Sequence, residues 1–119
     1  MRFHNRLSRH AYEGIALDLD ERARLGRDLG RNNAMILDNH GLITCGATVA
    51  EAFGLMYYLE RACQAQVAAL GGGVIPVRPS IDSIEKTATI FEQNMAKANT
   101  RDWPPLLRML DRIDTSYRT

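Results

Sequence analysis

The chain has 119 residues, of which 45% are apolar and 24% charged, and its formal net charge is +1. This composition is typical of one folded domain, and its scattered basic residues argue against nucleic-acid and anionic-membrane partners. No apolar run approaches the about 20 residues that span a bilayer, and residues 1–10 show neither a signal-peptide core nor a clear period.

The first helix is predicted over residues 19–29. Asp18 and Glu21 have the spacing of a capping box, apolar residues follow at helical intervals, and Gly30 supplies a left-handed stop. Residues 15–17, just before this helix, have the composition of a very short strand.

Two short β-type runs, AMILD (34–38) and LITCG (42–46), flank an Asn-His-Gly turn. They predict a hairpin whose first strand is covered on both faces, because its apolar run is unbroken. The turn contains His40. Since two strands alone are marginal in water, this hairpin is expected to join a larger sheet.

The longest predicted element is a helix over residues 49–70, which begins with the capping box of Thr48 and Glu51. Apolar residues at intervals of three and four make it amphipathic, and three glycines end it. Two further helices are predicted. One begins at the capping-box residue Asp82, and a short last helix begins at Asp102 with two prolines in its first turn.

Three sets of residues suggest chemistry, and each also has a purely structural interpretation. From spacing alone, His40 is favoured as a turn residue that hydrogen-bonds the backbone, because a zinc site needs three or four ligands and the chain has only three histidines. His10 and Glu13 could form an acid–base couple, but a surface ion pair is favoured. Cys45 and Cys63 lack C-x-x-C spacing and are interpreted as free thiols and small core residues in a reducing cytoplasm.

Residues 34–70 closely resemble the class II aldolase/adducin family. The shared pattern is an apolar strand, Asn-His-Gly, a second strand ending in Gly, and a helix beginning Thr-x-x-Glu-Ala-Phe. Residues 10–30 and 103–118 are similar to a bacterial branch of uncertain substrate. The resemblance implies an α/β fold, part of a three-layer α/β/α arrangement. Its sheet would be mostly antiparallel and include the hairpin near 34–46, followed by the long helix near 49–70 and further C-terminal helices.

The resemblance also makes His40 a metal ligand, because in this family the histidine of Asn-His-Gly is one of three that bind zinc. The other two belong to an H-x-H motif, and a glutamate from the first half usually serves as acid/base. Neither has a counterpart here, so residues 1–119 are expected to be the C-terminal portion of the domain, with the N-terminal half absent. The family metal holds a hydroxy-carbonyl substrate and stabilises its enediolate as a Lewis acid.

Three functions are therefore expected as alternatives. The first is a truncated metal-dependent lyase domain that is inactive alone, and the second is a half-site of such a lyase that a partner chain completes. The third is a non-enzymatic, self-assembling module. The divalent metal is expected to be zinc, or to be missing from this chain alone. No catalytic residue is assigned. Because the hairpin has an edge that must be covered, a homo-oligomer or binding to the N-terminal half is expected, in the cytoplasm.

Overall fold

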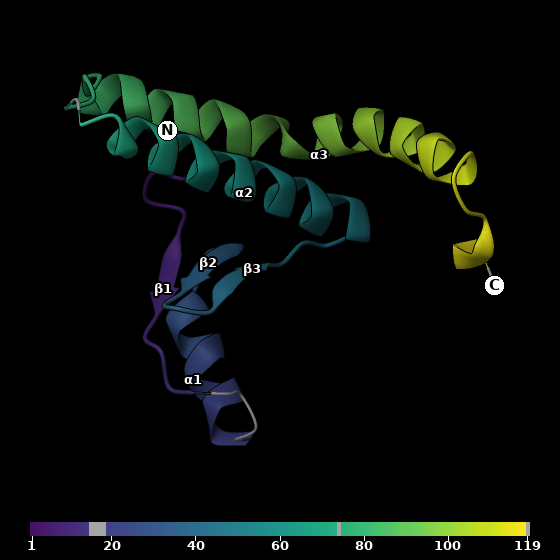
Figure 1. Cartoon of the computed structure of the whole chain (residues 1–119), viewed down its shortest axis with the longest axis horizontal. Helices are drawn as coiled ribbons and strands as arrows, with labels where there is room; N and C mark the ends of the chain where they lie inside the picture. Colours follow the sequence, from purple (N-terminus) through teal and green to yellow (C-terminus); the bar gives the residue numbers. More distant parts are fainter. Residues whose placement is uncertain (15–18, 74, 119) are drawn as a thin grey trace.

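The computed structural model describes residues 1–14, 19–73 and 75–118. Its elements in chain order are β1 (Ser8–His10), α1 (Leu19–Leu29), β2 (Ala34–Leu37), β3 (Gly41–Thr44), α2 (Val49–Gly71), α3 (Ile81–Asp111) and the 3-10 helix η1 (Ser116–Arg118). The sheet lies between α1 on one side and the paired helices α2 and α3 on the other (Figure 1). The α/β class and the layered arrangement agree with the prediction.

The sheet has the strand order β1–β2–β3, with β2 in the middle. β2 and β3 form the predicted hairpin, in an antiparallel register that pairs Ala34 with Thr44. β1 instead runs parallel to β2 and pairs His10 with Leu37. Strand β1 is not predictable from local sequence, because residues 1–10 have no period-two pattern. The sheet is therefore mixed and not wholly antiparallel.

Helix α1 covers the predicted residues 19–29 and is followed by Gly30, whose φ of +58° is left-handed as expected. The cap predicted at Asp18 and the strand predicted over 15–17 lie outside the described residues.

Helix α2 begins and ends as predicted. The Thr48 hydroxyl accepts a hydrogen bond from the Glu51 N–H (3.2 Å), and the Glu51 carboxylate accepts one from the Ala47 N–H (2.9 Å). This reciprocal capping satisfies N–H groups that have no partner inside the helix. The last helical residue is Gly71, and Gly73 adopts a left-handed φ of +67°. No described helix is both long and apolar enough to cross a membrane.

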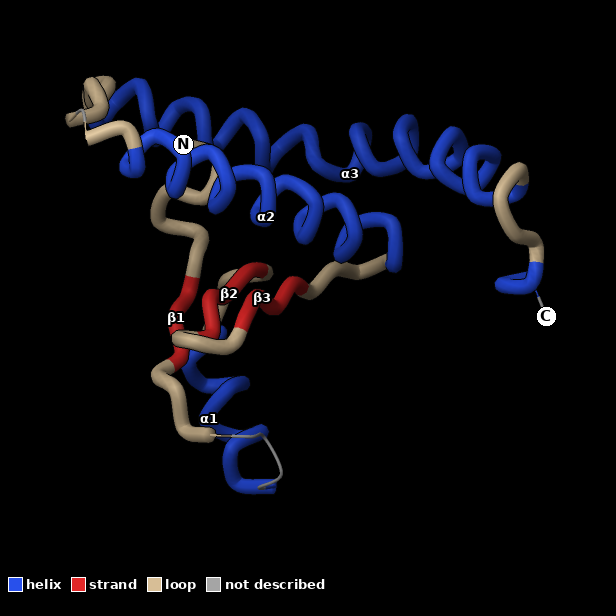
Figure 2. The backbone as a smooth tube through the Cα atoms, in the orientation of Figure 1, coloured by secondary structure: helices blue, strands red, loops and turns tan. Residues whose placement is uncertain are grey.

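Helix α3 is a single helix where two were predicted (Figure 2). The predicted start at Asp82 is wrong by two residues, because the N-cap is Ser80, whose hydroxyl accepts a hydrogen bond from the Ser83 N–H (3.2 Å). The second predicted start is also wrong. The Asp102 carboxylate accepts two hydrogen bonds from the neighbouring Arg101 guanidinium, at 2.6 and 3.2 Å, and caps no helix.

A contact with α2 lies next to the two prolines inside α3. The ring of Trp103 packs edge-on against Phe53, with centroids 5.5 Å apart. Proline disfavours a helix interior because it lacks an N–H and crowds the preceding turn, yet Pro104 and Pro105 lie within α3. Packing against α2 favours the helical path just before these prolines. The end of α3 then projects past the start of α2 (Figure 1).

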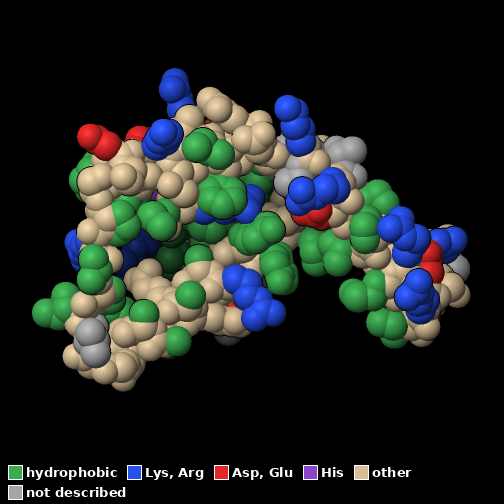
Figure 3. Space-filling view, turned by 90° about the horizontal axis from the view of Figure 1, so that it is seen from above, with side chains coloured by type: hydrophobic (Ala, Val, Ile, Leu, Met, Phe, Trp, Pro, Cys, Tyr) green, Lys and Arg blue, Asp and Glu red, His purple; other side chains and the backbone are tan. Residues whose placement is uncertain are grey.

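The core is small for a chain of this length. Among the described residues, its buried apolar side chains are Ala34, Met35, Leu55, Leu59 and Ala88. The radius of gyration is 16.7 Å, against about 13.5 Å for a compact domain of this length. The accessible surface is 9109 Å², against about 6,500 Å² for a compact monomer of 13.3 kDa. The excess is about 2,600 Å². Hydrophobic side chains lie open over α2 and α3 and on the projecting end (Figure 3).

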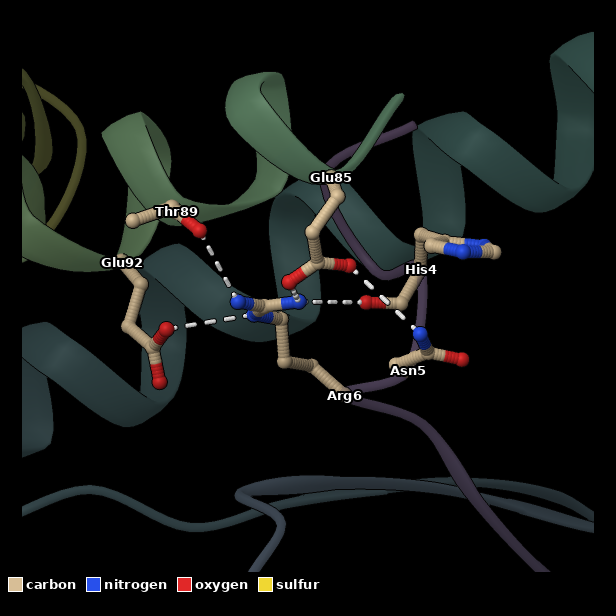
Figure 4. Close-up of polar contacts among 6 residues, drawn as sticks. All are labelled: His4, Asn5, Arg6, Glu85, Thr89 and Glu92. Carbon is tan, nitrogen blue, oxygen red and sulfur yellow. Dashed lines mark hydrogen bonds and ion pairs between the residues drawn. The ribbon is translucent and has the colours of Figure 1, made fainter. Parts of the chain in front are cut away.

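Arg6 fastens the N-terminal segment to α3 (Figure 4). Its guanidinium donates hydrogen bonds to Glu85 (2.7 Å), Glu92 (3.1 Å), the Thr89 hydroxyl (3.2 Å) and the carbonyl of His4 (2.9 Å). Hydrogen bonding from Arg6 is the main reason that the pKa of Glu85 lies below its ordinary value. The segment that leads into β1 is thus held against the helical layer.

Candidate functional site

His40 is exposed in the turn between β2 and β3. Its backbone N–H closes the turn by donating to the Leu37 carbonyl (3.2 Å), while Asn39 adopts a left-handed φ of +54°. Asn tolerates this conformation better than most residues do. The His40 ring makes no hydrogen bond or ion pair with another described residue. The turn is thus closed by the backbone of His40, and the imidazole is left to face outward.

Hydrogen bonds from the end of β1 hold this turn in place. The Asp38 N–H donates to the His10 carbonyl (3.0 Å), and the Asp38 carboxylate accepts a hydrogen bond from the Arg9 guanidinium. Because His10 pairs in register with Leu37, three residues before His40, both histidines belong to the same end of the sheet. The position of the turn therefore depends on β1 as well as on the hairpin.

The described residues do not complete a metal site around His40. A structural zinc site needs four protein ligands, and a catalytic zinc site needs three protein ligands and an open position. In the parts of the chain that the structure describes, the group of His, Cys, Asp or Glu side chains placed to share an ion leaves His40 out. The zinc ligation implied for His40 therefore does not fit the described residues alone, and it would need further donors.

The group that is placed to share an ion consists of His10, Glu13 and Glu21. His10 ends β1 and is 4% exposed, Glu21 lies in the first turn of α1 and is 8% exposed, and Glu13 lies between these elements. Nε2 of His10 is 3.9 Å from a carboxylate oxygen of each glutamate. The pair favoured for His10 and Glu13 is present, at 3.9 Å, but its expected place at the surface is wrong, because the packing of α1 on β1 buries the imidazole.

Asp28 holds the other side of the ring, with its Oδ2 2.6 Å from Nδ1 of His10. An ionised carboxylate only accepts hydrogen bonds, so Nδ1 carries the proton and donates. Nε2 is buried and has no hydrogen-bond partner among the described residues. Arg24 donates to Glu13 through Nε at 2.8 Å, which balances part of the negative charge around the ring.

Sequence reasoning found His10 and Glu13 but missed Asp28 and Glu21. These two acids belong to a different element and meet the imidazole only through tertiary packing. A signal was nonetheless present. Glu21 and Asp28 are seven residues apart in a predicted helix, a spacing that places two side chains on one helical face.

A cavity lies where the N-terminal segment meets α2 and α3. The Arg2 guanidinium lies 4.3 Å from the ring centre of Tyr58 and 5.3 Å from that of Phe91, and it contacts Sδ of Met95 at 2.8 Å. Burial lowers the pKa of Arg2. The adjoining cavity of about 70 Å³ has room for water molecules but not for an organic substrate. We therefore assign Arg2 a structural role as a cation between aromatic rings.

The cysteines have no part in these groups. Both are free, as expected. Cys45 follows the end of β3 at Thr44 and is exposed, so its predicted place among core strand residues is wrong. Cys63 is half-buried on α2.

The proteins to which this chain is similar are class II aldolase and adducin relatives. The family described as Class II Aldolase and Adducin N-terminal domain matches residues 2–67. A Pseudomonas aeruginosa protein named "Putative aldolase class 2 protein" is 43% identical over 116 residues, which are 94% of this chain and 45% of that protein. An adducin-related protein of Schizosaccharomyces pombe is 32% identical over 92% of this chain and 36% of its own length.

A solved structure extends the likeness to three dimensions. The aldolase II superfamily protein from Pseudomonas syringae superposes with a TM-score of 0.86 at 43% identity, over 99% of this chain and 48% of that one. The present chain thus spans about half the length of the bacterial relatives that it matches.

Proposed function

Because the chain belongs to the class II aldolase and adducin family, we propose that it carries one metal-ligating imidazole, His40, of a lyase domain that acts on small hydroxy-carbonyl compounds. The observation that supports this proposal is the geometry of the turn. An exposed ring without a partner among the described residues stands on a paired hairpin, within the part of the chain that matches the family. A turn residue with only a structural role would not require an imidazole.

In this proposal the remaining ligands come from outside the 119 residues, and the chain is inactive alone. The metal would be a divalent ion, zinc by family resemblance, which supplies Lewis-acid stabilisation of negative charge on a substrate oxygen. His40 would contribute one nitrogen ligand, and the β1 contacts of Asp38 would keep the turn in place. The cytoplasm is the proposed compartment, in keeping with the two free thiols.

The excess surface supports a proposal about the partner. About 2,600 Å² beyond the value for a compact monomer is on the scale of an obligate interface. Large apolar side chains such as Phe53, Tyr57 and Tyr58 on α2 are 43% to 48% exposed. Covering them would stabilise the fold through burial of apolar surface. We propose that the covering surface is the other half of the domain, supplied by a partner segment.

Reconstitution would test this function. The chain is mixed with the part of the Pseudomonas syringae protein that it does not cover, dialysed against zinc, and assayed for metal content and for turnover of small hydroxy-carbonyl compounds. We expect turnover in the mixture but not in the chain alone. His40→Ala should abolish this turnover and reduce the zinc retained by the mixture, whereas His4→Ala, a matched change away from the turn, should alter neither. Unchanged zinc and turnover after His40→Ala would refute the proposal.

The same exposed apolar surface favours a second candidate, a self-assembling module without catalysis. In that case the covering surface is a second copy of this chain. Light scattering after gel filtration distinguishes the two. A stable dimer or tetramer that does not dissociate when the complementary segment is added supports self-assembly. A chain that is monomeric at about 100 μM argues against it.

A further inference from the structure

We propose that His10, Glu13 and Glu21 bind one divalent transition-metal ion at a site separate from His40, with Asp28 as the residue that positions the imidazole. One nitrogen and two carboxylate oxygens, donated by β1, the following segment and α1, all lie within 4.8 Å of one another. The ion would join α1 to the end of the sheet.

The state of His10 is the observation that points to a ligand. Its side chain is 4% exposed, and Nε2 has no hydrogen-bond partner in the described part of the chain. A buried polar atom without a partner costs free energy, so most such atoms are paired. Because Nδ1 of His10 donates to Asp28, Nε2 is the ring nitrogen left to bind a ligand, and it lies 3.9 Å from an oxygen of each glutamate. A bare nitrogen beside two carboxylates is unfavourable unless a proton or a metal ion lies between them.

The local charge favours a dication. Glu13, Glu21 and Asp28 surround the ring, and among them Glu21 is 8% exposed with only the imidazole of His10 as an ion-pair neighbour among the described residues. Arg24 neutralises one of the three charges through Glu13. Two negative charges remain, which is the charge that a divalent ion balances. Burial of such carboxylates is otherwise unfavourable.

The distances around the His10 ring favour a metal ion over a shared proton at Nε2. Where a proton joins His10 to a carboxylate, at Asp28, the heavy atoms are 2.6 Å apart. At Nε2 both carboxylate oxygens stay at 3.9 Å, too far for an N–H···O bond. Ligands at about 2.1 Å around a tetrahedral zinc ion are about 3.4 Å from one another. To complete such a site through side-chain rotation, the two nitrogen–oxygen distances would close by about half an ångström. The distance between the two glutamate oxygens, which is at most 4.8 Å, would close by up to about 1.4 Å.

The donors and their surroundings indicate the class of metal. Imidazole with carboxylates suits zinc, manganese and iron, whereas magnesium and calcium prefer oxygen alone. The contact of Asp28 with Nδ1 is the carboxylate–histidine–metal arrangement that orients metal-binding imidazoles and raises their basicity. The site is therefore expected to bind Zn²⁺, with one or more positions left for water.

Zinc binding by the full chain would test this proposal. To remove a competing exposed thiol, all variants carry Cys45→Ser. Equilibrium dialysis should find one Zn²⁺ per chain. Glu21→Gln, which keeps the side-chain shape, should weaken binding about 100-fold or more, and Asp28→Asn about 10- to 100-fold. The matched control Glu60→Gln, at an exposed glutamate of α2, should leave affinity unchanged within about twofold.

Further readouts separate this site from His40 and from a fold defect. His40→Ala should retain Zn²⁺ in the chain alone, and Glu21→Gln should keep its far-ultraviolet circular dichroism without metal. Added Zn²⁺ should raise the melting temperature of the parent but not of Glu21→Gln. Equal binding by the parent and Glu21→Gln, or loss of binding only in His40→Ala, would overturn the proposal. No binding, together with nitrogen NMR shifts showing both His10 nitrogens protonated, would assign the site to a proton and also overturn it.

Discussion

Replacing Leu59 with alanine should remove much of the stability of the isolated chain. Leu59 lies in α2, is 1% exposed, and is one of the two largest fully buried side chains among the described residues. Leu→Ala changes in cores cost about 2 to 5 kcal/mol, because transfer free energy is lost and a cavity remains. Because the buried apolar core among the described residues is small, we expect a loss in the lower half of this range, about 3 kcal/mol. That is a large share of the about 5 to 15 kcal/mol that holds a domain folded.

Leu70→Ala provides the matched control, because it is the same substitution in the same helix at a residue that is 58% exposed. It should change the free energy of unfolding by less than about 0.5 kcal/mol. Urea unfolding followed by circular dichroism measures both. With a slope of about 2 kcal/mol/M, the midpoint should fall by about 1.5 M for Leu59→Ala and hardly move for Leu70→Ala. Equal losses, or a loss below about 1 kcal/mol for Leu59→Ala, would show that α2 is not held by this core.

Three further predictions concern the residue that follows the hairpin, the hairpin turn, and the ion pair between Arg6 and Glu85. Gly46→Ala should lower the free energy of unfolding by about 1 to 3 kcal/mol in urea, because the new Cβ would lie 2.7 Å from the backbone N of Ala52. Asn39→Ala should cost about 1 kcal/mol in thermal unfolding while Asn39→Gly costs little, and equal effects would argue against the left-handed turn. The pKa of Glu85 is lowered by Arg6, so their pairing stabilises the fold above the ordinary value of 4.5 and is lost as pH falls through the lower folded-state pKa. Glu85→Gln should therefore be less stable than the parent at pH 7, with a difference that disappears in acid, and a constant difference from pH 7 to pH 2 would contradict this assignment.

Local signals predicted the parts of the fold that depend on neighbouring residues. Thr48 and Glu51 predict the start of α2, and the caps form because each partner lies within four residues of the other. The hairpin follows from two β-type runs around a short turn. The fate of Asp102 could not be predicted in this way, because the path of α3 depends on the packing of Trp103 against α2.

The same contrast applies to the candidate sites. The resemblance to the family singled out His40, whose exposed position in the turn agrees with the predicted hairpin, while its role as a ligand stays a prediction. The residues around His10 come from β1, a strand of three residues without alternation, and from α1. Strand β1 pairs with residues of β2 that are about 27 positions later in the sequence. A sequence pattern within about 10 or 20 residues does not reveal such pairing.

The two histidines differ in what a cation would need from the rest of the protein. At His10, burial, the orienting Asp28 and two carboxylates are already present in the chain, so metal affinity should not depend on a partner. At His40 the ring is exposed and alone among the described residues, so affinity should appear only when a partner brings further donors. In the proposed function, the partner that supplies those donors also covers part of the exposed apolar side chains of α2. Metal binding at His40 and the stability of α2 should therefore rise together on reconstitution, whereas zinc at His10 should stabilise the chain on its own.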